Sequence, residues 1–251
     1  ESISSSLLPH YTQVLVIVKN DAYGGAFDAI TAVTAHPLAL EQGTHELGHA
    51  FAGLADEYLD AQQQGGSYTE GVWPNLTTKT DREHIPWKHW IEPDTAVPTL
   101  STVVEGQTGA EVVGLFEGGY YTSRSIYRPT FDSLMRSAGK PFGAVNGEVW
   151  ARQVYAQGGA WREVTPSPSA TLTGNARPAD GWRLKAQPLL DRSTVETRWY
   201  VDGTERPAER GAAELLVASP SVAKVRVDLV DITGRVRRDQ GVVSSLTWTL
   251  P

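Results

Sequence analysis

The sequence has no cysteine and a single methionine, Met135, among its 251 residues. Without cysteine the chain can form no disulfide, offers no thiolate ligand to a metal and has no cysteine nucleophile. Positive charge is also in short supply, because 29 acidic residues outnumber 22 Lys and Arg and give a net charge of −7. Nucleic acids and anionic membranes bind basic surfaces, so neither class of partner is expected.

Long apolar runs are missing as well. The longest, Val14 to Val18, has the length of a β-strand and falls far short of the roughly 20 residues of a membrane-spanning helix. Hydrophobic residues make up 40% of the chain and charged residues 20%, which is typical of a globular protein. The chain starts at Glu1 with neither Met nor a signal-peptide pattern, so we interpret it as a fragment or processed form that has lost any export signal.

The first part of the chain alternates strand-like and helix-like stretches. Thr12 to Lys19 is nearly continuously apolar and β-branched, which predicts a strand buried on both faces of a mixed sheet. Asp28 to Ala35 is a second strand candidate, although its alanines also permit a helix. From Leu38 to about Ala52 the apolar spacing is helical, and Gly53 can end that helix because glycine readily adopts a positive φ. A further helix is predicted from Asn146 to Ala156.

Two further regions follow: an irregular segment between the two predicted helices, and a strand-rich region at the end of the chain. Asp60 to Gly118 shows little periodicity, and we expect a long irregular segment with a short helix near Asp81 to Trp90. Gln157 to Ser169 is rich in Gly, Pro and Ser and is interpreted as a linker. The sequence therefore predicts an α+β domain over residues 1–160 and an all-β, immunoglobulin-like sandwich over residues 168–251. Six short runs with strand-like patterns support the sandwich: 170–174, 181–188, 195–201, 213–218, 223–231 and 244–250.

A metal-binding pattern occupies the first predicted helix. His45 and His49 are four residues apart, so a helix places both imidazoles on one face, where they can share one metal ion. Glu46 follows the first histidine and completes H-E-x-x-H, the zincin signature, whose chemistry is zinc-assisted hydrolysis, usually of a peptide bond. In this chemistry Glu46 is the general base, which takes a proton from water and passes it to the leaving amine.

A catalytic zinc ion needs a third protein ligand and one open position. Metzincin peptidases extend the signature to H-E-x-x-H-x-x-G-x-x-H or -D, and Gly53 to Asp56 reproduces G-x-x-D. Three residues rather than two separate His49 from the glycine, which leaves a choice between Asp56 and Glu57. We predict that Asp56 is the ligand and that Glu57 is a buried structural partner.

Other residues offer alternative metal chemistry. Glu70 would be the third ligand in a gluzincin arrangement. His84 and His89 flank Trp87, and each is better explained as an ordinary loop histidine than as a ligand. The acidic stretch from Asp56 to Asp60 would permit a structural Ca²⁺ ion.

The string H-E-L-G-H-A-F-A-G-L-A-D-E-Y, residues 45–58, resembles the motif of peptidase family M64, which is named for a bacterial immunoglobulin A peptidase. Val14 to Gly25 is similar to the family's strand and Y-G-G segment, and Tyr127 to Ser137 to its Met-turn region. The resemblance covers about the first two-thirds of the chain. It implies a zinc-dependent, metzincin-like bacterial peptidase that acts on proteins or peptides, glycoproteins included. Such enzymes are often secreted, periplasmic or on the cell surface, and often carry an added β-sandwich.

The resemblance also assigns roles near the only methionine. It implies that Met135 lies in an apolar Met-turn beneath the histidines, whereas the alternative is a core-filling methionine. Several metzincins have a tyrosine near this turn that donates a hydrogen bond to the oxyanion, but the residue two positions after Met135 is Ser137. Tyr127 is the candidate oxyanion donor that is left, with core packing as its alternative.

The resulting hypothesis is a zinc endopeptidase with His45, His49 and Asp56 as ligands and Glu46 as general base. The rival hypothesis is a non-catalytic surface adhesin or glycan-binding protein on a zincin-like scaffold. Such a protein would be recognised by the loss of the base or of a ligand, and the sequence shows neither loss. No chemistry is expected from the sandwich, because it contains no histidine.

Overall fold

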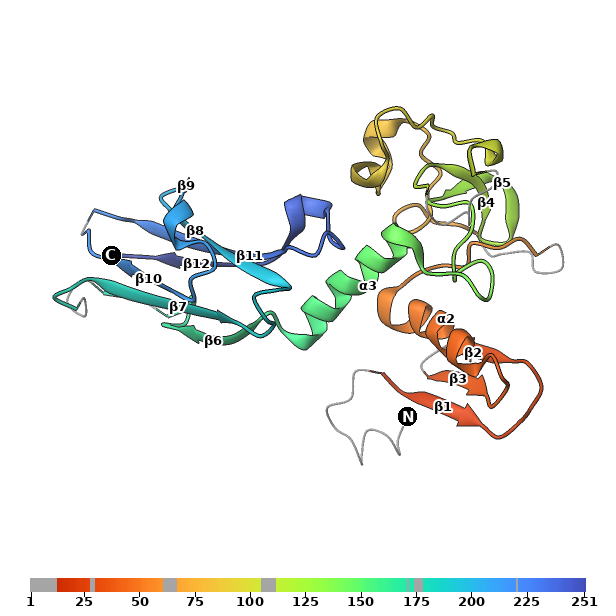
Figure 1. Ribbon diagram of the computed structural model, residues 1–251, viewed down its shortest axis with the longest axis horizontal. Coiled ribbons are helices and arrows are strands. Elements are labelled where there is room, and N and C mark those ends of the chain that lie inside the picture. The colour runs from red at the N-terminus through yellow and green to blue at the C-terminus, as the bar shows by residue number, and fades with distance from the viewer. Residues whose placement is uncertain are drawn as a thin grey trace. The chain divides into compact units, whose positions relative to one another are not determined.

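The computed structural model describes residues 13–27, 30–60, 67–104, 112–170, 172–173, 178–219 and 221–251. The chain divides into two compact units, residues 1–153 and 154–251 (Figure 1). The described residues form two α-helices, several short 3₁₀ turns and many strands, so the fold is mixed α and β with mostly sheet. Among them, no helix has the length and apolar character that crossing a membrane requires.

A three-stranded mixed sheet begins the first unit. Its strands are β1 (Leu15–Val18), β2 (Gly25–Phe27) and β3 (Thr31–Thr34), in the order β1-β3-β2. Strand β1 runs parallel to β3, and β2 runs antiparallel to it. The sequence therefore placed both predicted strands correctly, and the segment for which a helix was also considered is the strand β3.

The prediction that the first strand is buried on both faces is wrong. All four residues of β1 are exposed, from 41% at Val16 to 66% at Ile17. The reason is position, because β1 lies at the edge of the sheet while α2 (Ala39–Ala52) packs mainly against β2 and β3. A run of Val and Ile reports strand propensity, but burial depends on what covers the strand.

Helix α2 ends where the sequence predicts. Gly53 adopts a left-handed conformation with φ of 65°, and its N–H donates to the carbonyl of His49. This bond is the one that defines the αL cap, and the N–H of Leu54 donates in addition to the carbonyl of Gly48. This cap reverses the chain sharply and directs the following residues back along the helix.

Irregular backbone and one hairpin make up much of the rest of the first unit. The predicted short helix is two 3₁₀ turns, η1 (Arg82–His84) and η2 (Lys88–Trp90), and a third, η3 (Ser101–Val104), follows. Strands β4 (Phe116–Gly119) and β5 (Thr122–Arg128) form an antiparallel hairpin, and helix α3 (Gly143–Gly158) comes later in the chain. A buried apolar cluster holds this region together: Ile85, Trp87, Trp90, Ile91, Val113, Leu115 and Val145.

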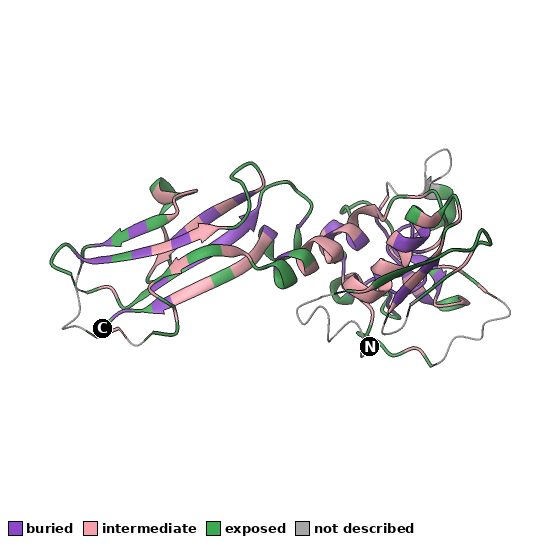
Figure 2. Ribbon diagram, turned by 90° about the horizontal axis from the view of Figure 1, so that it is seen from below, coloured by how far each residue is buried: buried purple, intermediate pink, exposed green. Residues whose placement is uncertain are grey.

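The second unit contains two antiparallel sheets. One has the order β10-β7-β6, and the other has the order β12-β11-β8-β9. Buried side chains from both sheets form one core, in which Trp199 and Trp248 stack with ring centroids 5.9 Å apart. Figure 2 shows the alternation of buried and exposed residues along these strands. The strand bounds are β6 Trp161–Thr165, β7 Trp182–Pro188, β8 Val195–Val201, β9 Thr204–Glu205, β10 Glu214–Val217, β11 Lys224–Asp231 and β12 Val242–Thr249, with 3₁₀ turns η5 Pro207–Glu209 and η6 Arg238–Gly241.

Two details of this unit differ from or refine the sequence prediction. The predicted linker contains β6, because Trp161 and Val164 pack against the core despite the Gly and Pro residues around them. The predicted run 170–174 lies partly outside the described residues. In β11 burial alternates from Lys224 to Val227, as the strand-like pattern of 223–231 predicts, but Asp228 and the strand residues after it are all buried.

Candidate metal centre

Three side chains converge at the end of helix α2. His45 and His49 lie one turn apart, and their Nε2 atoms are 3.1 Å from each other. The reversal at Gly53 brings Asp56 back to them, with its Oδ1 atom 3.1 Å from Nε2 of His45 and 3.2 Å from Nε2 of His49. The three atoms thus form a nearly equilateral triangle.

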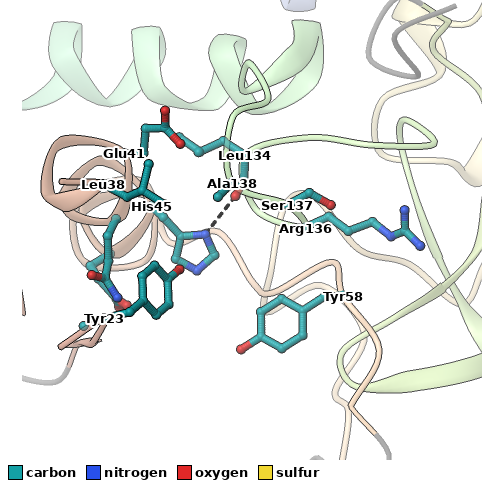
Figure 3. A pocket seen from close by; sticks show the side chains of 12 residues that line it. Tyr23, Leu38, Glu41, His45, Tyr58, Leu134, Arg136, Ser137 and Ala138 are labelled. Atoms are coloured by element: carbon teal, nitrogen blue, oxygen red, sulfur yellow. Dashed lines mark hydrogen bonds between the residues drawn. The ribbon is translucent and has the colours of Figure 1, made fainter. Parts of the chain in front are cut away.

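The other nitrogen of each imidazole is fixed by a backbone carbonyl. Nδ1 of His45 donates to the carbonyl oxygen of Leu134 at 2.9 Å, as the dashed line in Figure 3 shows. Nδ1 of His49 donates to the carbonyl oxygen of Leu54 at 2.6 Å. Because Nδ1 carries a proton in both rings, Nε2 is the atom that faces the carboxylate. It donates to Asp56 when the imidazole is protonated and offers a lone pair to a metal ion when the imidazole is neutral.

Three acceptor atoms that face one another repel unless positive charge lies between them. Ligands held about 2.0–2.1 Å from a tetrahedral metal ion lie about 3.3–3.4 Å apart, close to the spacing of this triangle. The hydrogen bonds at Nδ1 are those that orient metal-bound histidines in proteins. His45, His49 and Asp56 could therefore hold a metal ion, and among the described residues theirs is the one such group of three His, Asp or Glu side chains.

The electrostatics of the group match this arrangement. Burial acts to raise the pKa of Asp56, but hydrogen bonds from His45, His49 and Tyr121 outweigh it and hold the pKa well below its usual range. Burial acts to lower the pKa of His45, yet the bond to Asp56, the Leu134 carbonyl and nearby negative charge raise the pKa above its ordinary value. The carboxylate is thus kept ionised where a cation would bind.

A cavity of about 360 Å³ is lined by His45, the first of the three residues (Figure 3). Glu46 lines it together with His45, and burial raises the pKa of the Glu46 carboxyl. Strand β2 approaches this carboxylate closely, because a Cβ atom on Gly25 would lie 2.8 Å from Oε1 of Glu46. The remaining lining residues are Tyr23, Gly25, Leu38, Glu41, Gln42, Tyr58, Leu134, Arg136, Ser137 and Ala138.

Glu57, the neighbour of Asp56, points into the protein interior. It is fully buried, and Oε1 accepts hydrogen bonds from Nδ2 of Asn75 and of Asn146, each at 2.9 Å. Its Oε2 accepts a hydrogen bond from Oγ of Ser133 at 2.7 Å. Burial raises the pKa of Glu57 while these three bonds oppose the shift. Glu57 therefore joins three chain segments, and the structure brings Asp56 instead of Glu57 to the histidines.

Met135 is fully buried and packs with Ala52 and Leu54 at the end of helix α2. A Cβ atom on Gly48 would lie 2.8 Å from its sulfur, so the methionine contacts the helical turn that carries the histidines. Its carbonyl accepts the N–H of Glu57 at 2.9 Å, and the preceding residue, Leu134, accepts from His45. This loop is thus bonded both to an imidazole and to the segment that carries Asp56.

The structure does not bring Tyr127 to the group. Its side chain packs against the buried cluster around Trp87, and its backbone pairs with Thr77, which agrees with the core-packing alternative. The tyrosines beside Asp56 are Tyr121, whose hydroxyl donates to Oδ2 of Asp56, and Tyr58, whose ring lies 5.3 Å from that of Tyr121. Burial and the charge of Asp56 raise the pKa of Tyr58 to about 12. The sequence offers no reason to assign either residue a role, because the contact with Asp56 depends on the fold.

The other residues considered from the sequence lie elsewhere. Glu70 accepts hydrogen bonds from Thr77 and Thr78. His84 pairs with Asp81 at the surface, and His89 pairs with Glu148 of helix α3. The stretch from Asp56 to Asp60 forms no second group of metal-ligating side chains among the described residues, so the structure gives a Ca²⁺ ion no support there.

Two histidines, a carboxylate that converges on them and a glutamate next to the first histidine are residue types that metal-dependent hydrolases use. A family model described as IgA Peptidase M64 matches residues 2–105, which include all four of these residues. The match confirms the resemblance found in the motif and indicates a peptidase. It does not extend to Met135 or to the second unit. A search of curated proteins finds no relative that matches the chain.

Proposed function

We propose that this protein is a zinc-dependent endopeptidase in which His45, His49 and Asp56 hold a single catalytic zinc ion. The observation that carries the proposal is the triangle of Nε2 and Oδ1 atoms, with sides of 3.1–3.2 Å, whose imidazoles are locked through Nδ1. Two imidazoles and one carboxylate at tetrahedral spacing suit zinc, and three protein ligands leave a fourth position open. The family match supplies the substrate class, a protein or peptide.

When bound, zinc would lower the pKa of a water molecule to about 7 and polarise the scissile carbonyl group. Glu46 is the general base in this proposal, because it lines the same cavity as His45 and is the next residue along the helix. It accepts the proton of the attacking water and delivers it to the leaving amine. Burial raises the pKa of Glu46, which makes this carboxylate a better proton acceptor than an exposed one.

The wider assignments are part of the same proposal. We assign residues 1–160 to a metzincin-like catalytic domain, with Met135 in the Met-turn, which the contact between Met135 and the turn of Gly48 supports. We assign residues 168–251 to an immunoglobulin-like sandwich, which the shared core of the two antiparallel sheets supports. A secreted, periplasmic or cell-surface bacterial protein that cleaves proteins, glycoproteins included, fits these assignments.

Zinc analysis and a cleavage assay on casein and immunoglobulin test the proposal. The purified protein should contain one zinc ion per chain and lose cleavage with a metal chelator. Glu46→Gln should keep the zinc and lose cleavage, because it removes the base but no ligand, whereas His49→Ala should lose both. Substoichiometric zinc under metal-replete conditions would contradict the site, and cleavage by Glu46→Gln would contradict its role. Full zinc loading with no cleavage would favour the non-catalytic alternative.

A further inference from the structure

Tyr121 contacts the carboxylate at the centre of the proposed site from the side opposite the histidines. We propose that Tyr121 is a positioning residue that makes Asp56 bind the metal through Oδ1 alone. The hydroxyl of Tyr121 donates to Oδ2 of Asp56, while Oδ1 is the atom within 3.1–3.2 Å of the two Nε2 atoms. The inference rests on the proposed metal site and adds to it the group that fixes its third ligand.

The backbone that carries Tyr121 has a conformation that few residues other than glycine adopt. Tyr120 and Tyr121 form the two-residue turn between β4 and β5, with φ of 49° and 66° (Figure 1). Hairpin turns with two positive φ values are usually built from Asn and Gly, because a Cβ atom makes this region unfavourable. Two tyrosines therefore occupy a turn that favours other residues, and such an exception calls for a functional explanation.

The turn is bonded directly to the segment that contains Asp56. The N–H of Tyr120 donates to the carbonyl of Asp56 at 2.9 Å, and the N–H of Tyr121 donates to the carbonyl of Tyr58 at 3.1 Å. Residue Leu59 forms an additional parallel bridge with Tyr121. The hairpin thus holds both the main chain and the side chain of the third ligand.

The two tyrosine rings have different surroundings, which separates their roles. The ring of Tyr120 packs against Trp73 and Tyr68, with centroids 4.6 and 5.7 Å away. The ring of Tyr121 lies edge-on to Tyr58, and its hydroxyl reaches Asp56. Tyr120 anchors the turn through apolar contacts, and Tyr121 holds the carboxylate through a hydrogen bond. A hydrogen bond to Oδ2 opposes the rotation that would turn both oxygens toward a cation, so it favours binding through Oδ1 alone.

Tyr121→Phe tests the proposal, with Tyr120→Phe as a matched control that removes the same atom from the other residue of the turn. Zinc affinity is measured by competition with a chromophoric chelator, and ligand geometry by the visible spectrum of the Co²⁺-substituted protein. Tyr121→Phe should weaken zinc binding about 10- to 100-fold and alter the cobalt spectrum, because the loss of a hydrogen bond to a ligand has effects of this size. Tyr120→Phe should leave both unchanged.

Wild-type zinc affinity and an unaltered cobalt spectrum in Tyr121→Phe would overturn the proposal. A lowered kcat with unchanged zinc affinity would also overturn it, since that result would make Tyr121 a group that acts on substrate. If Tyr121→Phe does not fold, a crystal structure of the zinc-loaded wild type decides: binding through Oδ1 with Oδ2 on Tyr121 supports the proposal, and binding through both oxygens overturns it. Failure of the metal site itself would appear in the wild-type protein, which would then bind no zinc.

Discussion

Asp56 and Glu57 are adjacent carboxylates with opposite surroundings. Asp56 faces two imidazoles and a phenol, whereas Glu57 is fully buried and accepts hydrogen bonds from two asparagines and a serine. The two neighbouring carboxylates thus have different roles: Asp56 is the proposed metal ligand, and Glu57 is a buried hydrogen-bond acceptor. Because the extra residue before Gly53 left the choice between them open, only the three-dimensional structure separates them.

Conservative amide substitutions should separate the two tasks. Asp56→Asn removes the charged ligand, so it should abolish stoichiometric zinc binding with little effect on the unfolding of the metal-free protein. Glu57→Gln replaces one carboxylate oxygen by an amide nitrogen, so the hydrogen bonds that Asn75 and Asn146 donate to one oxygen and Ser133 to the other cannot all be kept. It should destabilise the fold by about 1–3 kcal/mol and still allow zinc to bind. Zinc analysis and urea unfolding of both variants test this, and an exchange of the two outcomes would show that the roles are reversed.

At the scale of single elements, the end of helix α2 depends on the residue that caps it. Gly53 supplies the left-handed conformation that turns the chain toward the histidines, and no heavy atom lies within 4 Å of the position of an added Cβ. The requirement for glycine is therefore one of backbone conformation and not of space. The same position decides both where the helix ends and where Asp56 can reach.

A pair of glycine substitutions tests this element. Gly53→Ala should destabilise the protein by about 1–2 kcal/mol, because a Cβ atom is unfavourable at its positive φ. Gly147→Ala in helix α3 is the control, since an added Cβ there also meets no atom within 4 Å but the backbone is helical. It should stabilise the protein by up to about 1 kcal/mol. Urea unfolding measures both changes, and a neutral Gly53→Ala would contradict the importance of the cap.

The sequence predicts some elements well because their determinants are local. Helix α2, its end at Gly53 and the alternation of β11 follow from spacing and propensity within a few residues. The exposure of β1 depends on which strands α2 covers, and strand β6 depends on packing that outweighs its Gly and Pro neighbours.

The residues of the site differ in the same way in how far the sequence predicts them. His45, His49 and Asp56 lie within one motif, but Tyr121 reaches Asp56 from a hairpin 65 residues later in the chain. The sequence Gly-Gly-Tyr-Tyr indicates a turn, but it does not indicate that the hydroxyl of Tyr121 contacts Asp56, because that contact depends on the fold.

At the scale of the whole molecule, the proposed metal links activity to stability. The two histidines and Asp56 belong to the first unit, and the buried tryptophan core of the second unit is formed by its own strands. A ligand that binds only the folded state stabilises that state, so an ion held by the first unit acts directly on the folding of that unit. Metal removal should therefore affect the two units differently.

A chelator should lower the thermal stability of the first unit and leave that of the second unchanged. Free zinc at about 1,000 times its Kd would stabilise the first unit by about 4 kcal/mol, and this contribution disappears on chelation. Differential scanning calorimetry of the full chain, with and without chelator, measures the effect. Readdition of zinc should restore the original profile. Identical profiles under both conditions would mean that no metal contributes to folding.

X-ray diffraction from crystals of the zinc-loaded protein, measured on both sides of the zinc absorption edge, tests the proposed metal centre most directly. The account predicts one anomalous peak about 2.0–2.2 Å from Nε2 of His45, Nε2 of His49 and Oδ1 of Asp56, with a fourth position that no side chain fills. The absence of a peak there, or a fourth protein ligand that closes the site, would contradict it.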